Sequence, residues 1–308
     1  MGLDAMLVNL GEVRNRGFEL SIGWNDRINK NFSYFVTGNF SYLKNWVSDI
    51  GVKNEDGTPG VWTDDKSFRS VKDIYQTTEG EPLNSFHLIQ KTGGLVLSDE
   101  EAAAYVDKNG KRIQPDAKKG DLKFVDYDGD GTIGFGDRQY MGSATPKTTF
   151  AWTLGFTWKK LSFSAMFQGV GGAQAMNVSK YMLLSDVEGN FNRSREILNA
   201  WSPDNRGSNI PILSKNDNNG NFSTASDWYL EDASYLRLKN VTLSYDLSDV
   251  FCKWSHLNDR NSRLSVFLSG ENLATITRYS GMDPECGGWD ALKYPVSRVF
   301  SLGVKLTY

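Results

Sequence analysis

An aspartate-rich stretch in the first half of the chain has the residue types and spacing of a calcium loop. Oxygen ligands recur at alternate positions before a final carboxylate, and a glycine stands at the sixth position; the five candidate ligands are Asp126, Asp128, Asp130, Thr132 and Asp137. A hard cation needs several oxygens that converge on one point, and Gly131 allows the sharp turn that brings them together. Calcium is therefore the one cofactor that the sequence offers.

The same stretch has a second interpretation, which we favour. Asp137 replaces the usual bidentate glutamate, and no helical pattern flanks the loop, so it is not an EF-hand. Aspartate and glycine also build tight turns in which the carboxylates accept hydrogen bonds from nearby backbone N–H groups. The alternative to calcium is thus an Asp/Gly-rich hairpin satisfied by its own backbone.

Enzymatic and nucleic-acid functions find no support in the sequence. The two histidines, His87 and His256, lie neither at a metal-binding spacing nor beside a plausible nucleophile, and the regular acidic cluster is unsuited to a catalytic carboxylate pair. The net charge of −3 provides no basic surface for nucleic acid. We expect no enzyme and no nucleic-acid partner.

The alternation of residue types predicts that the chain is built mainly of β-strands. In seven segments, apolar or aromatic residues alternate with small or polar ones; they are 18–24, 32–42, 150–158, 161–167, 241–247, 264–268 and 300–308. Each segment therefore has one apolar and one polar face, and is about as long as a tilted membrane strand requires. The low mean hydropathy of −0.45 is compatible with this, since only alternate residues would face lipid. The predicted fold is all-β, an antiparallel transmembrane β-barrel segment of about seven C-terminal strands with long extracellular loops.

Short and long connections alternate, which predicts the sidedness of the barrel. Short periplasmic turns and long extracellular loops are typical of such barrels. Trp24, Trp158 and the terminal Tyr308 would then form an aromatic girdle at the periplasmic side. Cys252 would lie in an inner turn and Cys286 in an outer loop, too far apart for a disulfide.

An odd number of strands leaves an unpaired apolar edge, which lipid does not tolerate. We therefore expect residues 1–308 to be the C-terminal part of a longer barrel, with residues 48–145 as a long extracellular insertion and with earlier strands absent. The start of the chain also lacks a signal peptide. The alternative is a soluble all-β carbohydrate-binding module, in which the apolar faces of two sheets bury each other.

Five sequence blocks resemble the SusC/RagA family of TonB-dependent outer-membrane transporters. They are NLGEVRNRGFEL at 9–20, DYDGDGTIGFGDR at 126–138 followed by Gly142 and Pro146, FQGVGG at 167–172, DASYLRLKNVTL at 232–243, and SGENLATITRYSGMDPE at 269–285. The blocks follow the family's order over essentially the whole chain. The resemblance implies a barrel of about 22 strands, of which this chain would supply the last third.

The resemblance also implies a function, partners and a location. A family member imports oligosaccharides or peptides across the bacterial outer membrane, is capped by a SusD-like surface lipoprotein, and receives energy from the TonB complex through an N-terminal plug that is absent here. Glycan or peptide substrate would bind among the lipoprotein, the plug and the barrel loops. Flat aromatic faces stack on sugar rings, so four loop tryptophans are candidates for substrate contact: Trp62, Trp201, Trp228 and Trp289. The alternative is that these side chains pack the loops together or against the lipoprotein.

Overall fold

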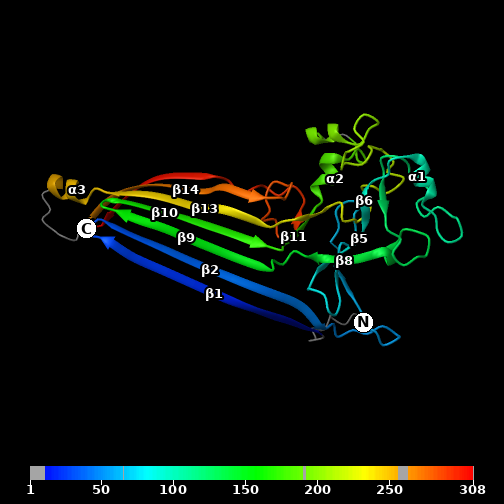
Figure 1. The fold of residues 1–308 in the computed structure, drawn as a ribbon, viewed down its shortest axis with the longest axis horizontal. Helices are drawn as coiled ribbons and strands as arrows, with labels where there is room; N and C mark the ends of the chain where they lie inside the picture. The colour runs from blue at the N-terminus through cyan, green and yellow to red at the C-terminus, as the bar shows by residue number, and fades with distance from the viewer. Residues whose placement is uncertain (1–10, 65, 190–191, 256–262, 308) are drawn as a thin grey trace, which may run out of the picture.

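The largest element of the computed structural model, which describes residues 11–64, 66–189, 192–255 and 263–307, is a seven-stranded antiparallel sheet (Figure 1). Its strands follow one another in chain order: β1 (Glu12–Asn29), β2 (Phe32–Asp49), β9 (Thr148–Trp158), β10 (Leu161–Gly171), β13 (Tyr235–Asp246), β14 (Arg263–Thr277) and β16 (Val299–Thr307). All seven predicted strands are confirmed, although several are longer than the alternating pattern indicated. β1 and β16 are the two edges of this sheet.

The register aligns the apolar residues of the seven strands on one side of the sheet. Phe18 lies opposite Tyr42, Val36 opposite Leu154, and the alignment continues across the sheet to β16. We call this side the apolar face. It is widely exposed, with Leu302 at 82%. A contiguous exposed apolar surface of this kind marks contact with lipid or with a partner.

The opposite side, the polar face, carries hydroxyl and amide groups that bond across neighbouring strands. Ser21 donates to Asn39 at 2.8 Å, and the hydroxyls of Thr157 and Ser162 lie 3.1 Å apart. The sheet is thus amphipathic across its width, because each strand alternates with a period of two.

Glycines in the sheet lie beneath aromatic rings of the adjacent strand. A Cβ at Gly38 would lie 2.4 Å from the Trp152 ring on the apolar face, and a Cβ at Gly155 would lie 2.5 Å from the Phe35 ring on the polar face. Each ring occupies the space that a side chain at the glycine would fill. Glycine at these positions therefore lets a large aromatic side chain of the neighbouring strand pack against the backbone.

The connections separate by length at the two ends of the sheet (Figure 1). β1 and β2 are joined through residues 30–31, and β9 and β10 through residues 159–160. The third connection at this end contains α3 (Ser248–Ser255), where only a turn was expected; the Ser248 N–H bonds to Asp246 Oδ1 at 2.7 Å just before it. None of the helices found among the described residues is long and apolar enough to span a membrane.

The long connections fold together at the other end into what we call the loop lobe, formed by described residues of 50–147, 172–234 and 278–298 (Figure 1). One small sheet contains β3 (Trp62–Asp64), β4 (Tyr75–Thr77), β5 (Ser85–Ile89) and β8 (Arg138–Ser143). A second pairs β6 (Lys91–Leu95) with β7 (Leu122–Phe124), and a third contains β12 (Leu230–Asp232), β11 (Gln174–Asn177) and β15 (Trp289–Asp290). The helical segments of the lobe are α1 (Asp99–Ala104), η1 (Phe135–Asp137), α2 (Ser179–Leu184) and η2 (Arg195–Asn199).

The loop lobe has its own hydrophobic core, built from segments that are far apart in the sequence. Phe86 and Leu88 of β5 pack in one cluster with Tyr181 of α2 and with Phe222 and Tyr229 of the second long connection. All five side chains are nearly or fully buried. The long loops therefore hold a defined shape above the sheet, since such a core is close-packed.

The two cysteines lie at opposite ends of the molecule. Cys252 is on α3 beside the short connections, and Cys286 is buried at the loop-lobe end. In the described part of the chain the two cysteines form no disulfide, as predicted.

Candidate functional site

Two of the four candidate tryptophans are buried inside the loop lobe. Trp201 is 4% exposed and lies against Gly120, where a Cβ would come within 2.5 Å of the ring; this glycine has a φ of +88°. Trp228 is 7% exposed, meets Tyr229 edge-on at 4.8 Å, and donates from Nε1 to the Asn209 carbonyl at 3.0 Å. In this conformation both side chains pack the loops together, which is the alternative that the sequence left open.

The other two tryptophans are more accessible. Trp62 on β3 is 41% exposed. Trp289 on β15 is half-buried, with its ring 6.4 Å from that of Tyr75 and 5.3 Å from the Lys66 ammonium. Stacking on a substrate stays a prediction for these two, and Trp62 offers the larger free face.

The aspartate-rich loop turns on hydrogen bonds from its own backbone. Asp126 accepts from the N–H groups of Gly129 and Gly131 at 2.8 and 3.0 Å, and Asp130 accepts from the N–H and hydroxyl of Thr132 at 2.7 and 2.8 Å. Carboxylate oxygens of Asp126, Asp128 and Asp130 nevertheless lie within 4.8 Å of one another. This is the self-satisfied turn that we favoured, and calcium binding stays a prediction.

Asp137, the expected last calcium ligand, closes this loop. It is 1% exposed and accepts from the N–H groups of Tyr127 and Gly134 at 2.7 and 2.6 Å. The strands on either side, β7 and β8, belong to different small sheets, so the segment is a turn-rich connection and not a hairpin.

Aromatic side chains collect on the apolar face near the short connections. Trp24 donates from Nε1 to the Tyr34 hydroxyl at 3.1 Å. The ring of Phe156 lies 6.0 Å from Phe32 and 5.4 Å from Phe163. Trp158, 52% exposed, follows Phe156 on the same face of β9. The girdle itself stays a prediction, and Tyr308 lies outside the described residues.

An ion-pair cluster that we did not predict from the sequence lies where β13 and β14 enter the loop lobe. The register of β13 shifts against both neighbours around Lys239, where β14 leaves two residues unpaired opposite this one residue of β13. This bulge reverses the alternation, so that Arg237 lies opposite Gln168 and Thr275 on the polar face. Without the bulge, alternation from Val241 would place Arg237 on the apolar face.

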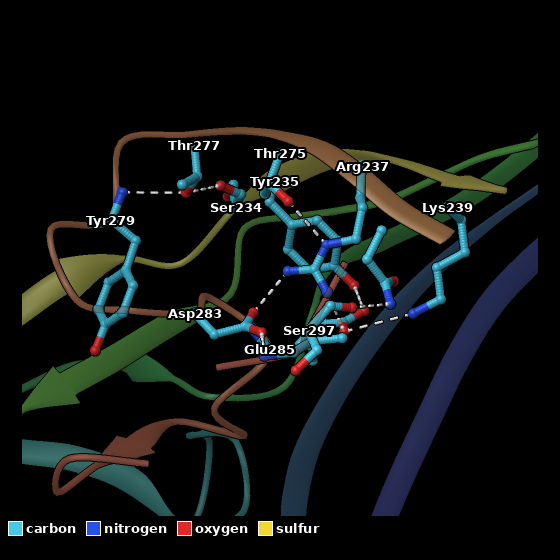
Figure 2. Close-up of polar contacts among 12 residues, drawn as sticks. Ser234, Tyr235, Arg237, Lys239, Thr275, Thr277, Tyr279, Asp283, Glu285 and Ser297 are labelled. Atoms are coloured by element: carbon cyan, nitrogen blue, oxygen red, sulfur yellow. Dashed lines mark hydrogen bonds and ion pairs between the residues drawn. The ribbon is translucent and has the colours of Figure 1, made fainter. Parts of the chain in front are cut away.

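Arg237 binds two carboxylates of the last long connection (Figure 2). Its guanidinium contacts Asp283 at 2.6 Å and Glu285 at 2.7 Å, and its Nε donates to the Thr275 hydroxyl at 2.9 Å. The Tyr235 hydroxyl donates to Glu285 as well. The arginine side chain is only 3% exposed, so the charges are held in a largely dry environment where each needs its partner.

The carboxylate of Asp283 is also held by the backbone of its own loop. Burial alone would raise the pKa of Asp283, but hydrogen bonds from the N–H of Glu285 and from Arg237 outweigh burial and lower it. A further bond runs from the Val296 N–H to the same carboxylate at 3.0 Å. The cluster thus anchors the loop at 278–298 to the polar face of the sheet.

Two hollows near the junction of the sheet and the loop lobe combine polar and apolar groups in their linings. A hollow of about 460 Å³ on the polar face is lined by hydroxyls and amides, among them Ser21, Asn39 and Gln168, together with Glu19. A larger cavity of about 750 Å³ separates the sheet from the lobe and includes Gln174 in its lining. Such surfaces suit solutes that form many hydrogen bonds, such as glycans or peptides.

The sequence did contain a signal for the anchor that we did not use. Arg237, Asp283 and Glu285 all fall within the blocks at 232–243 and 269–285. The opposite charges near the loop ends of these segments could have suggested that Arg237 pairs with the two carboxylates. Nothing in the sequence indicated the bulge that turns Arg237 toward them.

The fold and this arrangement define a class of protein, a segment of transmembrane β-barrel wall with a folded loop lobe at one end. Comparison with known proteins agrees. The chain is 27% identical to TonB-dependent receptor P3 of Formosa agariphila over its whole length, and 26% identical to TonB-dependent receptor SusC of Bacteroides thetaiotaomicron over 98% of its length. It spans about 30% of the first relative and 27% of the second. A scan against protein-family models found no match.

Solved structures show the same fold. A structure of the RagAB peptide transporter matches with a TM-score of 0.70 and 24% identity, over 97% of this chain and 30% of that one. The RagAB peptide importer in its open-open state matches with a TM-score of 0.69. The relatives are receptors and transporters, not enzymes. These matches support the resemblance: the chain has the fold of a barrel segment and is similar to TonB-dependent receptors of the SusC/RagA type.

Proposed function

We propose that the chain forms part of the wall and the outer loops of a TonB-dependent nutrient transporter in the bacterial outer membrane. The observation that carries this proposal is the amphipathic sheet: its apolar face is exposed across seven strands, and its polar face bears the loop anchor. The apolar face would contact lipid, and the polar face would line the lumen. The loop lobe would lie at the cell surface, with residues 48–145 as its largest part.

The relatives suggest what such a transporter carries. One relative is named SusC, and the matched structure is described as a peptide transporter. We propose oligosaccharides or peptides as substrates, with a SusD-like lipoprotein above the loop lobe and the TonB complex acting through a plug that precedes this segment. Hydroxyl, amide and carboxylate groups in the hollow beside Asn39 and Gln168 support a hydrogen-bonding solute.

The soluble carbohydrate-binding module is the weaker alternative. A sandwich would cover the apolar face with a second sheet. In the described part of the chain, the three smaller sheets belong to the loop lobe instead, and residues such as Phe300 and Leu302 stay exposed.

Expression of the full-length protein in cells tests the proposal. It should fractionate with the outer membrane and migrate faster on a gel before heating than after, as folded barrels do. Deletion of its gene should abolish growth on one glycan or peptide source. Recovery of folded, monomeric protein from the aqueous fraction without detergent would refute the membrane assignment.

A further inference from the structure

A row of cations borders the apolar face on β1 and β2 at the loop-lobe end. One row of this face pairs Phe18 with Tyr42, the next pairs Arg16 with Lys44, and the row beyond pairs Arg14 with Trp46. β1 has no register shift between Val13 and Arg27, so these rows lie on the same side of the sheet. The two cations therefore lie on the apolar side of the sheet, directly beyond the row of Phe18 and Tyr42.

The two cations lie directly opposite each other on the paired strands. Cross-strand neighbours have Cβ atoms about 5 Å apart, and like charges at this spacing repel. Arg14, one row further, is paired with Glu12 at 2.7 Å. In the part of the chain that the structure describes, neither Arg16 nor Lys44 has a carboxylate within ion-pair distance. The Lys44 ammonium lies 5.8 Å from the centroid of the Trp46 ring, and both cations are exposed.

The surroundings of this pair indicate an amphipathic anion. Next to the cation pair, on the side away from the loop lobe, the Phe18 ring lies 5.7 Å from Phe40 and 6.0 Å from Tyr42. Leu20 continues this exposed apolar surface. The ladder between β2 and β9 ends beside the pair, at Tyr42 opposite Thr148. Cations above aromatic rings at the edge of an apolar band match the level of lipid headgroups.

We propose that Arg16 and Lys44 bind the phosphate of a phosphorylated lipid in the outer leaflet, whose acyl chains lie along the Phe18 and Leu20 surface. The proposal rests on the proposed function, which places this end of the sheet at the cell surface. The arginine fork can hold two phosphate oxygens, and the lysine adds a point charge. The bound phosphate removes the repulsion between the two cations.

Native mass spectrometry of the full-length protein in detergent tests this proposal. The probes are hexa-acylated lipid A carrying its phosphates and the same lipid after dephosphorylation. The wild type should retain the phosphorylated lipid about tenfold more than the dephosphorylated one, and the Arg16→Ser/Lys44→Ser variant should lose this preference. The matched control, Lys159→Ser/Lys160→Ser, removes two cations at the opposite end and should keep it.

Equal retention by the wild type and the Arg16→Ser/Lys44→Ser variant would overturn the proposal. So would complete displacement of the lipid by millimolar inorganic phosphate, since the pair would then be a site for free anions. Heat-modifiable migration on a gel is measured for every variant to show that its barrel is folded. If the double variant does not insert into the membrane, lipid retention is measured with Arg16→Gln instead. Loss of lipid preference in an inserted barrel leaves the proposed transport function intact, whereas a wild type that is not heat-modifiable refutes that function.

Discussion

Arg237 shows how one side chain can fix the position of a whole loop. The bulge at Lys239 turns it to the polar face, where it meets Asp283 and Glu285. Removing one member of such a buried group leaves uncompensated charges and costs about 3–5 kcal/mol. The free energy of holding the loop at 278–298 against the sheet therefore depends strongly on this arginine.

Arg237→Met should release the last loop, and the native thiol of Cys286 reports the release. Cys286 is 2% exposed in that loop. In a Cys252→Ser background, we expect the wild-type thiol to resist a maleimide reagent under native conditions and the Arg237→Met thiol to react at least about tenfold faster, given the cost of the unpaired charges.

Lys239→Met is the control for this experiment. Its ammonium lies 3.8 Å from Glu285 and its side chain is 33% exposed, so its removal should change the labelling rate little. Equal labelling of the wild type and Arg237→Met would show that the ion pairs do not hold the loop.

His87 should make the loop lobe sensitive to acid. It lies between the rings of Phe135 and Tyr140 at 5.5 and 4.8 Å, and burial, together with the nearby charge of Arg138, lowers its pKa to about 4. The unfolded lobe, with a histidine pKa of about 6.5, then binds a proton more readily than the folded lobe. The free energy of unfolding of the lobe therefore keeps its full value above about pH 6.5. It falls by up to about 3 kcal/mol as the pH drops to 4.

Protease digestion of the lobe at pH 7 and pH 4.5 measures this effect. The wild type should be cut faster at pH 4.5, whereas His87→Phe, which keeps an aromatic ring and cannot titrate, should show a smaller change. Protonation of Asp283, whose pKa is lowered, destabilises the folded lobe only below about pH 4 and so does not contribute at pH 4.5. An identical pH response in both proteins would rule out His87 as the cause.

At the scale of elements, the strands could be predicted from the sequence because their signal is local. Phe150, Trp152, Leu154, Phe156 and Trp158 share one face in the sequence and in the structure. The loop lobe could not be predicted, since its core joins residues more than a hundred positions apart, such as Leu88 and Phe222. For the same reason, burial of Trp201 and Trp228 could not be read from their positions. The bulge at Lys239 was missed because alternation alone contains no sign of an extra residue.

Single charges on the two faces of β9 should have opposite consequences. Leu154 lies on the apolar face and is 40% exposed, whereas its neighbour Thr153 lies on the polar face. Leu154→Arg should reduce the heat-modifiable folded fraction of the full-length protein, because a charge facing lipid costs about 2–4 kcal/mol near the membrane centre. Thr153→Arg should leave that fraction nearly unchanged.

The reverse result, or equal loss in both variants, would mean that the apolar face does not contact lipid. Densitometry of unheated samples on a gel is sufficient to compare the two.

At the scale of the whole molecule, the chain combines a membrane wall with a structured outer lobe. The short connections lie at one end, and the lobe, anchored through Arg237, lies at the other (Figure 1). If the sheet spans the outer membrane, its two ends lie on opposite sides of that membrane. The lobe would then face substrate and lipoprotein, and α3 would face the periplasm.

Thiol labelling of intact cells tests whether the two ends of the sheet lie on opposite sides of the outer membrane. In the full-length protein with Cys286 replaced by Ala, Tyr294→Cys places a thiol at a loop position that is 88% exposed, and native Cys252 lies on α3. A membrane-impermeant maleimide should label position 294 in intact cells and Cys252 only after the outer membrane is permeabilised. Labelling of Cys252 but not position 294 in intact cells would show that the sheet has the opposite orientation.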